Sequence, residues 1–461
     1  MHREAFSKNR WLRGALLLLA VVLLCAVANL LGFAVFRSEH IMKNTAQYAV
    51  THESEGRYPT FVNGGYDGTR LDNFTDAWIL LIASYNGPES AAEKAFGGYY
   101  WEEADVEDMN PDDILIHYWQ NHFAENADPA NAPPLVRGEY ARYWHGYILP
   151  LRILLTLFDY STLRVLNMDV QFLLLLAVVL AFYRRLRGRF LLPFLLTLLP
   201  LYPGVAALSL QFAPVFYLTM ALLLYLLLRG GEARGRGLSV PLAFALTGVL
   251  VNFFDLLTYP LLSLCLPLMV LCLLRTGERA GKQGLTVASC TAAWFLGYGG
   301  MWGLKWLLSG AVLHRDVVQE AIGAILYRTG VTGDTAIDIG EMLRANYRNA
   351  FGVAFLILCA LVLLGGALVL WLRRRRGQDA LPGADAAACA WMVAVALLPV
   401  VWMVILKNHS YIHSWFTYRI LAAQIFAAGC AAESGLRYIA AGSGADKGPL
   451  SYRRGGRQYR R

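Results

Sequence analysis

The chain has 461 residues, of which 57% are hydrophobic and 16% charged, with a formal net charge of +8. A soluble domain is typically about 45–50% apolar and about 25% charged, so this composition excludes an ordinary soluble protein and a disordered chain. It predicts an all-α polytopic membrane protein, because helices that face lipid need apolar residues on every side. The seven Cys stand singly, without CxxC spacing, and no soluble basic face indicates nucleic-acid binding.

Apolar runs of the length that crosses a bilayer, roughly 17–25 residues, follow one another along the chain. They predict about ten spans, at residues 11–36, 160–183, 190–206, 213–228, 238–254, 258–274, 285–308, 350–372, 386–406 and 415–435. We expect a single transmembrane domain over residues 1–435 and a basic tail over 436–461. The first run lacks a small-residue cleavage site, which favours a retained helix over a signal peptide.

The distribution of charge predicts the orientation. Twenty-five Lys and Arg residues lie within residues 1–13, after residue 435 and in the loops 184–189, 229–237, 275–283 and 373–376. The segment 37–146 instead carries 7 basic and 18 acidic residues. The positive-inside rule then predicts that both termini are cytoplasmic and that 37–146 lies outside a bacterial-type plasma membrane.

Segment 37–146 is too long for a simple connector, and loops of this length are usually functional. We expect its amphipathic stretches to form juxtamembrane helices on the outer surface, where Trp and Tyr are enriched. A second outer loop, 309–349, has similar stretches. The predicted short helices are at 72–85, 89–97, 112–126, 316–328 and 335–348.

Three carboxylates, Asp67, Asp72 and Asp76, fall within ten residues of the outer segment. If a helix starts at Asp72, then Asp72 and Asp76 lie one turn apart on one face. A carboxylate beside an apolar wall can have a raised pKa and serve as a general base. Asp72 could equally be only an N-cap, and for Asp67 and Asp76 a structural role is the favoured interpretation.

Basic residues gather at two other outer positions. Arg152 lies in apolar surroundings, where it either has a function or extends its charge to the interface. Lys407, His409, His413 and Arg419 form the densest polar cluster in the last third of the chain. The two His residues could bind a metal, but no HExxH pattern accompanies them. An anion site fits better, because Arg offers a bidentate fork and Lys and His add donors.

A turn between two predicted spans contains Asp255 and Tyr259. Asp255 could line a cavity at the outer end of the helices, or cap the helix that follows it. No Walker A, GxSxG, HExxH or GxGxxG pattern with strand context is present, so an ATP-driven pump, a serine hydrolase and a zinc protease are disfavoured.

These features together resemble the GT-C superfamily of polytopic glycosyltransferases. The resemblance rests on a first span from the cytoplasm, a large outer loop with early acidic residues, the element RYWHGYILPLRILLTLFDYSTLRVLN at 142–167, and the basic loop YRRLRGR at 183–189. Many relatives have His-Pro-Pro where this chain has His145-Gly-Tyr. The resemblance covers most of residues 1–275 and does not identify a subfamily.

The resemblance implies transfer, with inversion, of a sugar from an outer-leaflet polyprenyl phosphate to a hydroxyl group of a cell-envelope glycan, lipid or protein. Asp72, or else Asp76 or Asp67, would be the general base, with membrane lipids as surroundings. The phosphate-binding residues would be Arg419, His409, His413, Lys407 and Arg152. The substrate cavity would include His145, Tyr143, Trp144, Asp255, Tyr259, Tyr411 and Tyr418.

The resemblance implies no certain cofactor and no metal site. It leaves a divalent cation open, because some relatives need one and others do not. A ligase or polymerase for lipid-linked glycans is the alternative that would use the same donor. A lipid or sugar flippase or transporter is less favoured, because no internal repeat is visible and the ionisable groups lie at the outer edge.

Overall fold

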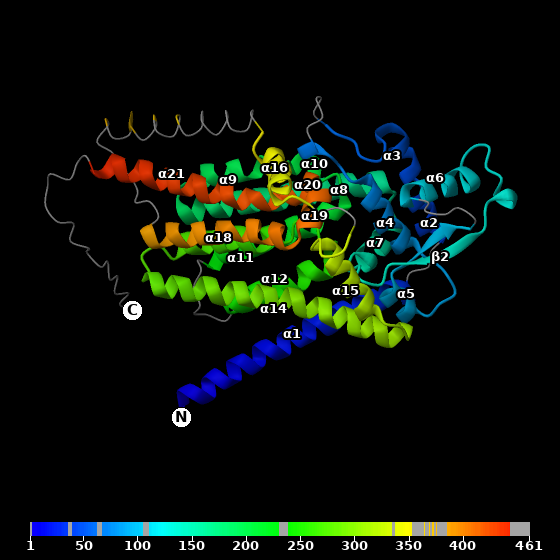
Figure 1. Ribbon diagram of the computed structural model, residues 1–461, viewed down its shortest axis with the longest axis horizontal. Helices are drawn as coiled ribbons and strands as arrows, with labels where there is room; N and C mark the ends of the chain where they lie inside the picture. The colour runs from blue at the N-terminus through cyan, green and yellow to red at the C-terminus, as the bar shows by residue number, and fades with distance from the viewer. Residues whose placement is uncertain are drawn as a thin grey trace, which may run out of the picture.

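The protein is elongated, with a helix bundle at one end and a mixed cap at the other (Figure 1). This computed structural model describes residues 2–35, 39–61, 67–104, 110–229, 238–333, 337–352 and 385–442, with the single residues Leu364, Leu368, Trp371, Leu372 and Arg375. The chain begins at the bundle end, and its first helix runs toward the cap.

The bundle is built from apolar helices that lie roughly along the long axis (Figure 1). Among the residues that the structure describes, four stretches are long and apolar enough to cross a membrane: Leu12–Val35, Tyr160–Leu186, Leu210–Arg229 and Ala386–Ile405. The helices of the bundle are α1 (His2–Val35), α8 (Tyr160–Leu186), α9 (Leu191–Leu198), α10 (Pro203–Ala206), α11 (Ala213–Arg229), α12 (Val240–Phe254), α13 (Leu262–Leu274), α14 (Ala280–Leu313), α18 (Ala386–Ile405) and α21 (Ala422–Gly442).

The helical character agrees with the sequence, whereas the number of ten spans stays a prediction. α12 and α13 are apolar but shorter than a usual span. The predicted run 190–206 is divided into α9 and α10, because Tyr202 has φ +45° and Pro203 follows it. A left-handed residue before a proline ends a regular helix. The predicted span 350–372 lies mostly outside the described residues.

The cap consists mainly of the predicted outer segment. Helices near 72–85, 89–97 and 112–126 are present as α4, α5 and α6. The elements of the cap are α2 (Glu39–Ala46), α3 (Tyr48–Glu55), η1 (Asp67–Thr69), α4 (Asn73–Ser84), α5 (Ala91–Gly97), β1 (Tyr99–Glu103), α6 (Pro111–His122), η2 (Pro129–Asn131), β2 (Leu135–Glu139) and α7 (Ile148–Leu155).

A two-stranded antiparallel sheet departs from the all-α expectation. β1 pairs with β2 in the register Tyr99↔Glu139 to Glu103↔Leu135. The sequence YYWEE, whose aromatic residues suggested an interfacial belt, instead forms a strand, because aromatic side chains also favour a half-buried pleated surface. Gly98, with φ +60°, ends α5 and turns the chain into β1.

Between bundle and cap lie short helices, most of them from the second half of the chain (Figure 1). The predicted helices 316–328 and 335–348 are present as α15 and α16. These junction elements are η3 (Leu210–Phe212), α15 (Val317–Arg328), α16 (Ile339–Ala350), α19 (Lys407–Ile412), α20 (Ser414–Thr417) and η4 (Tyr418–Leu421). They carry the polar residues that the sequence singled out after residue 400.

α12 and α14 approach each other more closely than side chains would allow. A Cβ atom on Gly248 would lie 2.2 Å from the carbonyl oxygen of Trp294, and one on Gly297 equally close to that of Ala245. Glycine therefore lets the two backbones touch, as is common where helices pack in membranes.

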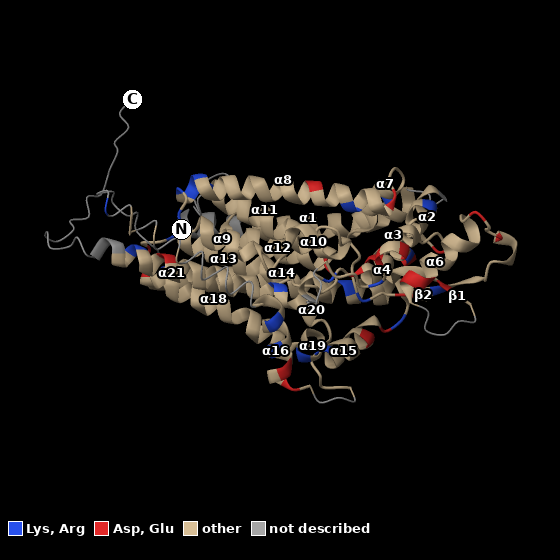
Figure 2. Ribbon diagram, turned by 90° about the horizontal axis from the view of Figure 1, so that it is seen from above, with Lys and Arg blue, Asp and Glu red and all other residues tan. Residues whose placement is uncertain are grey.

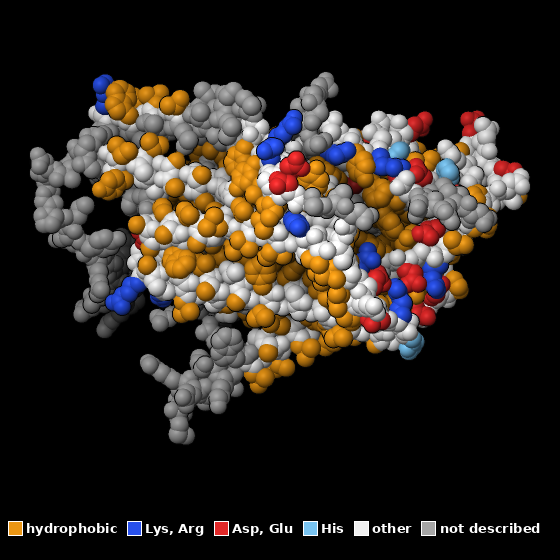
Figure 3. All heavy atoms as spheres, viewed as in Figure 1, with side chains coloured by type: hydrophobic (Ala, Val, Ile, Leu, Met, Phe, Trp, Pro, Cys, Tyr) orange, Lys and Arg blue, Asp and Glu red, His pale blue; other side chains and the backbone are white. Residues whose placement is uncertain are grey.

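The surface divides into an apolar bundle and a charged cap. On the face shown in Figure 3, hydrophobic side chains cover the bundle, whereas acidic and basic side chains gather over the cap. Exposed leucines on the bundle include Leu173 (67%), Leu296 (76%) and Leu397 (58%). An apolar surface of this extent is typical of a protein embedded in lipid. Figure 2 shows most of the acidic residues at the cap end, away from the start of α1.

Candidate functional site

Asp72 lies at the start of α4, where bundle and cap meet, and only 2% of the residue is exposed. Its Oδ1 atom accepts a hydrogen bond from the Thr75 backbone N–H (2.9 Å), which makes it the N-cap. Its Oδ2 atom accepts from the Thr75 hydroxyl (2.6 Å) and from the Gln211 side-chain amide. Burial raises the pKa of Asp72 to about 6. Asp72 is therefore ionised at neutral pH and readily protonated.

Asp76, one turn later, is completely buried and bound more firmly. Its Oδ2 atom accepts from the Tyr160 hydroxyl (2.7 Å) and the Leu210 N–H (2.9 Å). Its Oδ1 atom accepts from the Gln211 N–H (3.0 Å) and the Ser209 hydroxyl (3.2 Å). Burial raises the pKa of Asp76 too. Two of these donors are backbone groups that cannot rotate away, so Asp76 fastens α4 to α8 and η3.

Arg419 is the most unusual basic residue of the junction, with none of its surface exposed. Its Nη1 atom donates to the Trp415 carbonyl (3.2 Å), and its guanidinium carbon lies 4.3 Å from the centre of the Phe212 ring. Nε and Nη2 are buried and have no hydrogen-bond partner among the described residues. These two atoms form the edge that pairs with two oxygen atoms of a carboxylate or phosphate.

The short helix η3 joins Asp72 to Arg419. Gln211 donates to the Asp72 carboxylate, and the next residue, Phe212, contacts the Arg419 guanidinium group with its ring. A carboxylate with a raised pKa and an arginine edge with unused donors are thus held by consecutive residues. We call Asp72, Gln211, Phe212, Trp415 and Arg419 the junction site.

An aromatic stack leads from the junction site to the surface. The Arg70 guanidinium carbon lies 4.8 Å from the Tyr58 ring centre and 5.3 Å from that of Trp415. The Tyr58 and Trp415 rings contact each other edge to face, with centres 5.7 Å apart. Tyr58 is 37% exposed, whereas Trp415 is 8% exposed.

Tyr418 and Tyr259 support the same region. The Tyr418 hydroxyl lies 2.7 Å from the carbonyl oxygens of both Gly68 and Pro200, and it ties η1 to the bundle. The Tyr259 hydroxyl donates to the Phe212 carbonyl (2.7 Å) and fixes η3. Both tyrosines are therefore positioned around the junction site with their hydroxyl groups already bound.

His409 and His413 form a neighbouring pair instead of contacting Arg419. The His409 Nε2 atom is 2.9 Å from the Leu257 carbonyl, and the two imidazole centres are 4.8 Å apart. Burial lowers the pKa of His409, and it lowers the pKa of His413 to about 4, so both rings are neutral at pH 7. His413 stacks on Phe416, whose ring lies 6.1 Å from Phe212. The pair can offer hydrogen bonds but no positive charge.

Other predicted residues of the last segment point elsewhere. Lys407 begins α19 and packs beside Gly330, and Tyr411 is 42% exposed on the same short helix. Asp255 follows α12 and accepts from the Thr258 N–H and hydroxyl within the turn. It does not cap the following helix, because α13 begins at Leu262 and Leu261 is its N-cap residue. Burial raises the pKa of Asp255 to about 7.

A second group of predicted residues lies in the cap. The Arg152 Nη1 atom donates to the carbonyl oxygens of Ala83 (2.6 Å) and Tyr85 (3.3 Å) at the end of α4. Both ring nitrogens of His145 are bound, Nδ1 to the Tyr147 hydroxyl and Nε2 to the Tyr140 carbonyl, each at 2.7 Å. Burial lowers the pKa of His145 to about 3, so its ring is neutral.

Tyr143 and Trp144, next to His145, are also held by the protein. The Tyr143 hydroxyl accepts from Arg328 Nη2 (2.8 Å), and Trp144 Nε1 donates to the Met301 carbonyl (2.8 Å). Trp144 is 1% exposed. These contacts join the cap to α14 and α15, and they leave no donor of Trp144 for a substrate.

Two expectations remain: Asp67 as the third acidic candidate, and a divalent cation. Asp67 begins η1, but its side chain lies outside the described part of the structure. Among the described residues, no three His, Cys, Asp or Glu side chains gather in a way that could hold a metal ion.

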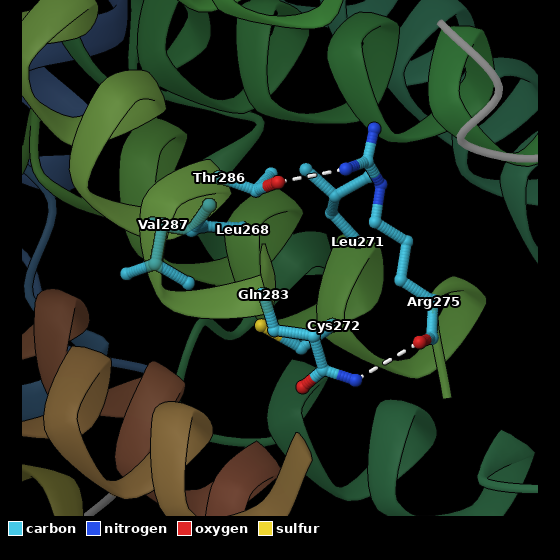
Figure 4. Close-up of a pocket in the computed structure, with 7 residues that line it drawn as sticks. All are labelled: Leu268, Leu271, Cys272, Arg275, Gln283, Thr286 and Val287. Carbon is cyan, nitrogen blue, oxygen red and sulfur yellow. Dashed lines mark hydrogen bonds between the residues drawn. The ribbon is translucent and has the colours of Figure 1, made fainter. Parts of the chain in front are cut away.

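A narrow space between α13 and α14 lies at the far end of the bundle (Figure 4). Arg275 donates to the Thr286 hydroxyl (2.7 Å), and the Gln283 amide donates to the Arg275 carbonyl (2.9 Å). The space holds no volume that a water molecule could occupy. It is therefore a packing feature and not a binding site.

Sequence reasoning missed Gln211, Phe212, Arg70 and Arg328 as neighbours of the predicted residues. A signal for the first existed, because Ser209 and Gln211 interrupt an apolar stretch with polar side chains. No local pattern indicates that Arg328 approaches Tyr143, since 185 residues separate them.

No protein-family model, curated protein or solved structure matches this chain.

Proposed function

We propose that this protein is a membrane glycosyltransferase of the GT-C type. It would move a sugar from an outer-leaflet polyprenyl phosphate to a hydroxyl group of a cell-envelope glycan, lipid or protein. The junction site would be its active site, with Asp72 as the general base and Arg419 as the phosphate ligand.

The unused edge of Arg419 carries this proposal. A buried guanidinium group whose Nε and Nη2 atoms lack partners is energetically costly, because each unpaired charged donor loses its hydration. A phosphate oxygen pair would satisfy both donors at once. The Phe212 ring beside the guanidinium group offers an apolar wall that suits the isoprenoid chain next to that phosphate.

The chemistry assigned to the two charged groups is a single displacement. Asp72 takes the proton of the acceptor hydroxyl group. At the same time the oxygen atom of that hydroxyl group forms a bond to the anomeric carbon, from the face opposite the phosphate. The bond between that carbon and the lipid phosphate breaks, and the phosphate leaves with the bonding electron pair. Arg419 stabilises the negative charge that develops on the departing phosphate. One displacement inverts the configuration of the sugar.

Asp72 suits the role of base better than Asp76. Two of the three donors to Asp72 are side-chain groups, on Thr75 and Gln211, which can rotate aside when an acceptor arrives. Asp76 is fixed by two backbone N–H groups. A pKa of about 6 leaves Asp72 mostly ionised at neutral pH yet basic enough to accept a proton.

The charge distribution supports an outer location for this site. The described part of the acidic segment 37–146 builds most of the cap, and the described basic residues of 184–189 and 275–283, with Arg229, belong to the other end of the bundle helices. The positive-inside rule then orients the cap outward, with both termini in the cytoplasm. Donor and acceptor would meet where the outer leaflet touches the junction.

The test is sugar transfer in membrane vesicles that contain the protein, a labelled undecaprenyl-phosphate sugar from a panel, and the native acceptors. Asp72→Asn should lower the transfer rate by roughly 10²–10⁴-fold, the usual contribution of a general base. Normal membrane insertion of the variant is the control. Full activity of Asp72→Asn, with an inactive Asp76→Asn, would move the base by one turn. Full activity of both variants would overturn the assignment.

A further inference from the structure

A groove with a volume of about 490 Å³ lies between α8 and α11, near the ends of both helices that point away from the cap. Its walls are mostly apolar, and two arginines close one end. The apolar lining consists of Ala177, Leu180, Ala181, Leu224, Leu227 and Leu228.

The sequence explains the shape of the groove. Ala177, Leu180 and Ala181 recur at helical spacing and form one stripe of α8. Leu224, Leu227 and Leu228 form the same pattern on α11, which packs against α8. The two alanines are small, so they leave space beside the leucines of the facing helix. An apolar space of this kind on a helix bundle matches an acyl chain.

Arg184 and Arg185 continue the α8 stripe by one turn and line the end of the groove. Both are exposed. No hydrogen bond or ion pair of Arg184 is present among the described residues, whereas Arg185 also has an interaction within the protein. Figure 2 shows this end of α8 as a basic patch. Two guanidinium groups at the mouth of an apolar groove match a phosphate next to a hydrocarbon chain.

We propose that this groove binds an acidic phospholipid, with one acyl chain between α8 and α11 and the head-group phosphate on Arg184 and Arg185. A soluble anion would gain nothing from the apolar walls, and a zwitterionic lipid would gain less from two arginines. Charge complementarity therefore selects the acidic lipid. This site is separate from the junction site and belongs to the opposite end of the bundle.

The experiment is native mass spectrometry of the full chain, purified in detergent and mixed with equal amounts of phosphatidylglycerol and phosphatidylcholine of the same chain length. We expect the wild type to retain phosphatidylglycerol in preference to phosphatidylcholine. Arg184→Gln with Arg185→Gln should reduce the phosphatidylglycerol adduct roughly tenfold, given the contribution of each basic residue near a membrane surface. The double substitution to Lys should keep most of the adduct.

Two further variants separate the groove from general surface charge. Ala181→Phe fills the groove and leaves both arginines, so it should also remove the adduct. Lys282→Gln removes an exposed charge of α14 and should leave the adduct unchanged. Retention of the adduct in both Ala181→Phe and the double Gln variant would overturn the proposal. Displacement by glycerol 3-phosphate, which has no acyl chain, would also overturn it in favour of a simple anion site.

Discussion

Two regions of the molecule contain buried basic groups that the sequence marked as functional, and they use those groups differently. In the cap, Arg152 donates to the end of α4, and both ring nitrogens of His145 are bound within the protein. In the junction site, Arg419 keeps one complete edge of its guanidinium group without a partner among the described residues. Burial of a basic side chain therefore does not identify a site, whereas a complete edge of two unused donors, as on Arg419, indicates one.

The contrast predicts the largest effect on stability at Arg152. Arg152→Gln shortens the side chain and removes the donor from the Ala83 and Tyr85 carbonyls, which are then left unsatisfied. The free energy of unfolding should fall by about 2–3 kcal/mol. Denaturant unfolding in detergent measures this change. If Arg152→Gln were as stable as the wild type, the structural role assigned to Arg152 in the cap would be wrong.

The pH dependence of sugar transfer tests the role of Asp72 in the junction site. Because Asp72 acts as a base only when ionised, and its pKa is about 6, kcat/KM should be level above pH 7. It should fall about tenfold per pH unit below pH 6. The pH profile of kcat/KM should fall at the same pH in the wild type and in Arg152→Gln. A fall near pH 4, the value for an ordinary exposed aspartate, would contradict the assignment of Asp72.

The smallest expected effect is on the free energy of unfolding, which burial of the ionised Asp72 carboxylate lowers. The folded pKa of about 6 exceeds the value of about 4 for an unfolded aspartate, so the folded state binds more protons between these pH values. Stability is therefore highest below pH 4 for this group and decreases as pH rises through 6.

The asparagine side chain of the Asp72→Asn variant cannot ionise, but its oxygen atom can still accept a hydrogen bond from the Thr75 N–H. We expect this variant to be more stable than the wild type by about 1 kcal/mol at pH 7.5, while it loses activity. The midpoint of thermal unfolding at pH 4.5 and pH 7.5 measures the difference. A variant that is equally destabilised at both values would show that Asp72 serves only as an N-cap.

The sequence predicts much of the local structure correctly because apolar periodicity and caps are local signals. α4, α5, α8 and α15 lie close to their predicted bounds. The strand Tyr99–Glu103 was missed because its aromatic run also suits a membrane interface, and only pairing with Leu135–Glu139 decides between them. Likewise, the break at Tyr202 depends on one left-handed residue inside an apolar run.

The candidate site could be predicted only in part. Asp72 was named as one of three clustered carboxylates and Arg419 as part of the densest polar cluster after residue 400. However, 347 residues separate them, and no pattern indicates that η3 holds both. The sequence also could not separate Arg419 from Arg152, since both were expected to bind the donor phosphate. The difference depends on which carbonyls reach each guanidinium group, and that is set by tertiary packing.

Binding of undecaprenyl phosphate to the purified protein tests the central claim most directly. The ligand carries the phosphate and the isoprenoid chain but no sugar, so neither the sugar nor the acceptor needs to be known. Arg419→Gln should weaken binding roughly 30-fold, because a charged bidentate pair is lost, while Arg152→Gln binds like the wild type. Equal affinity of Arg419→Gln and the wild type would contradict the assignment of the phosphate to Arg419.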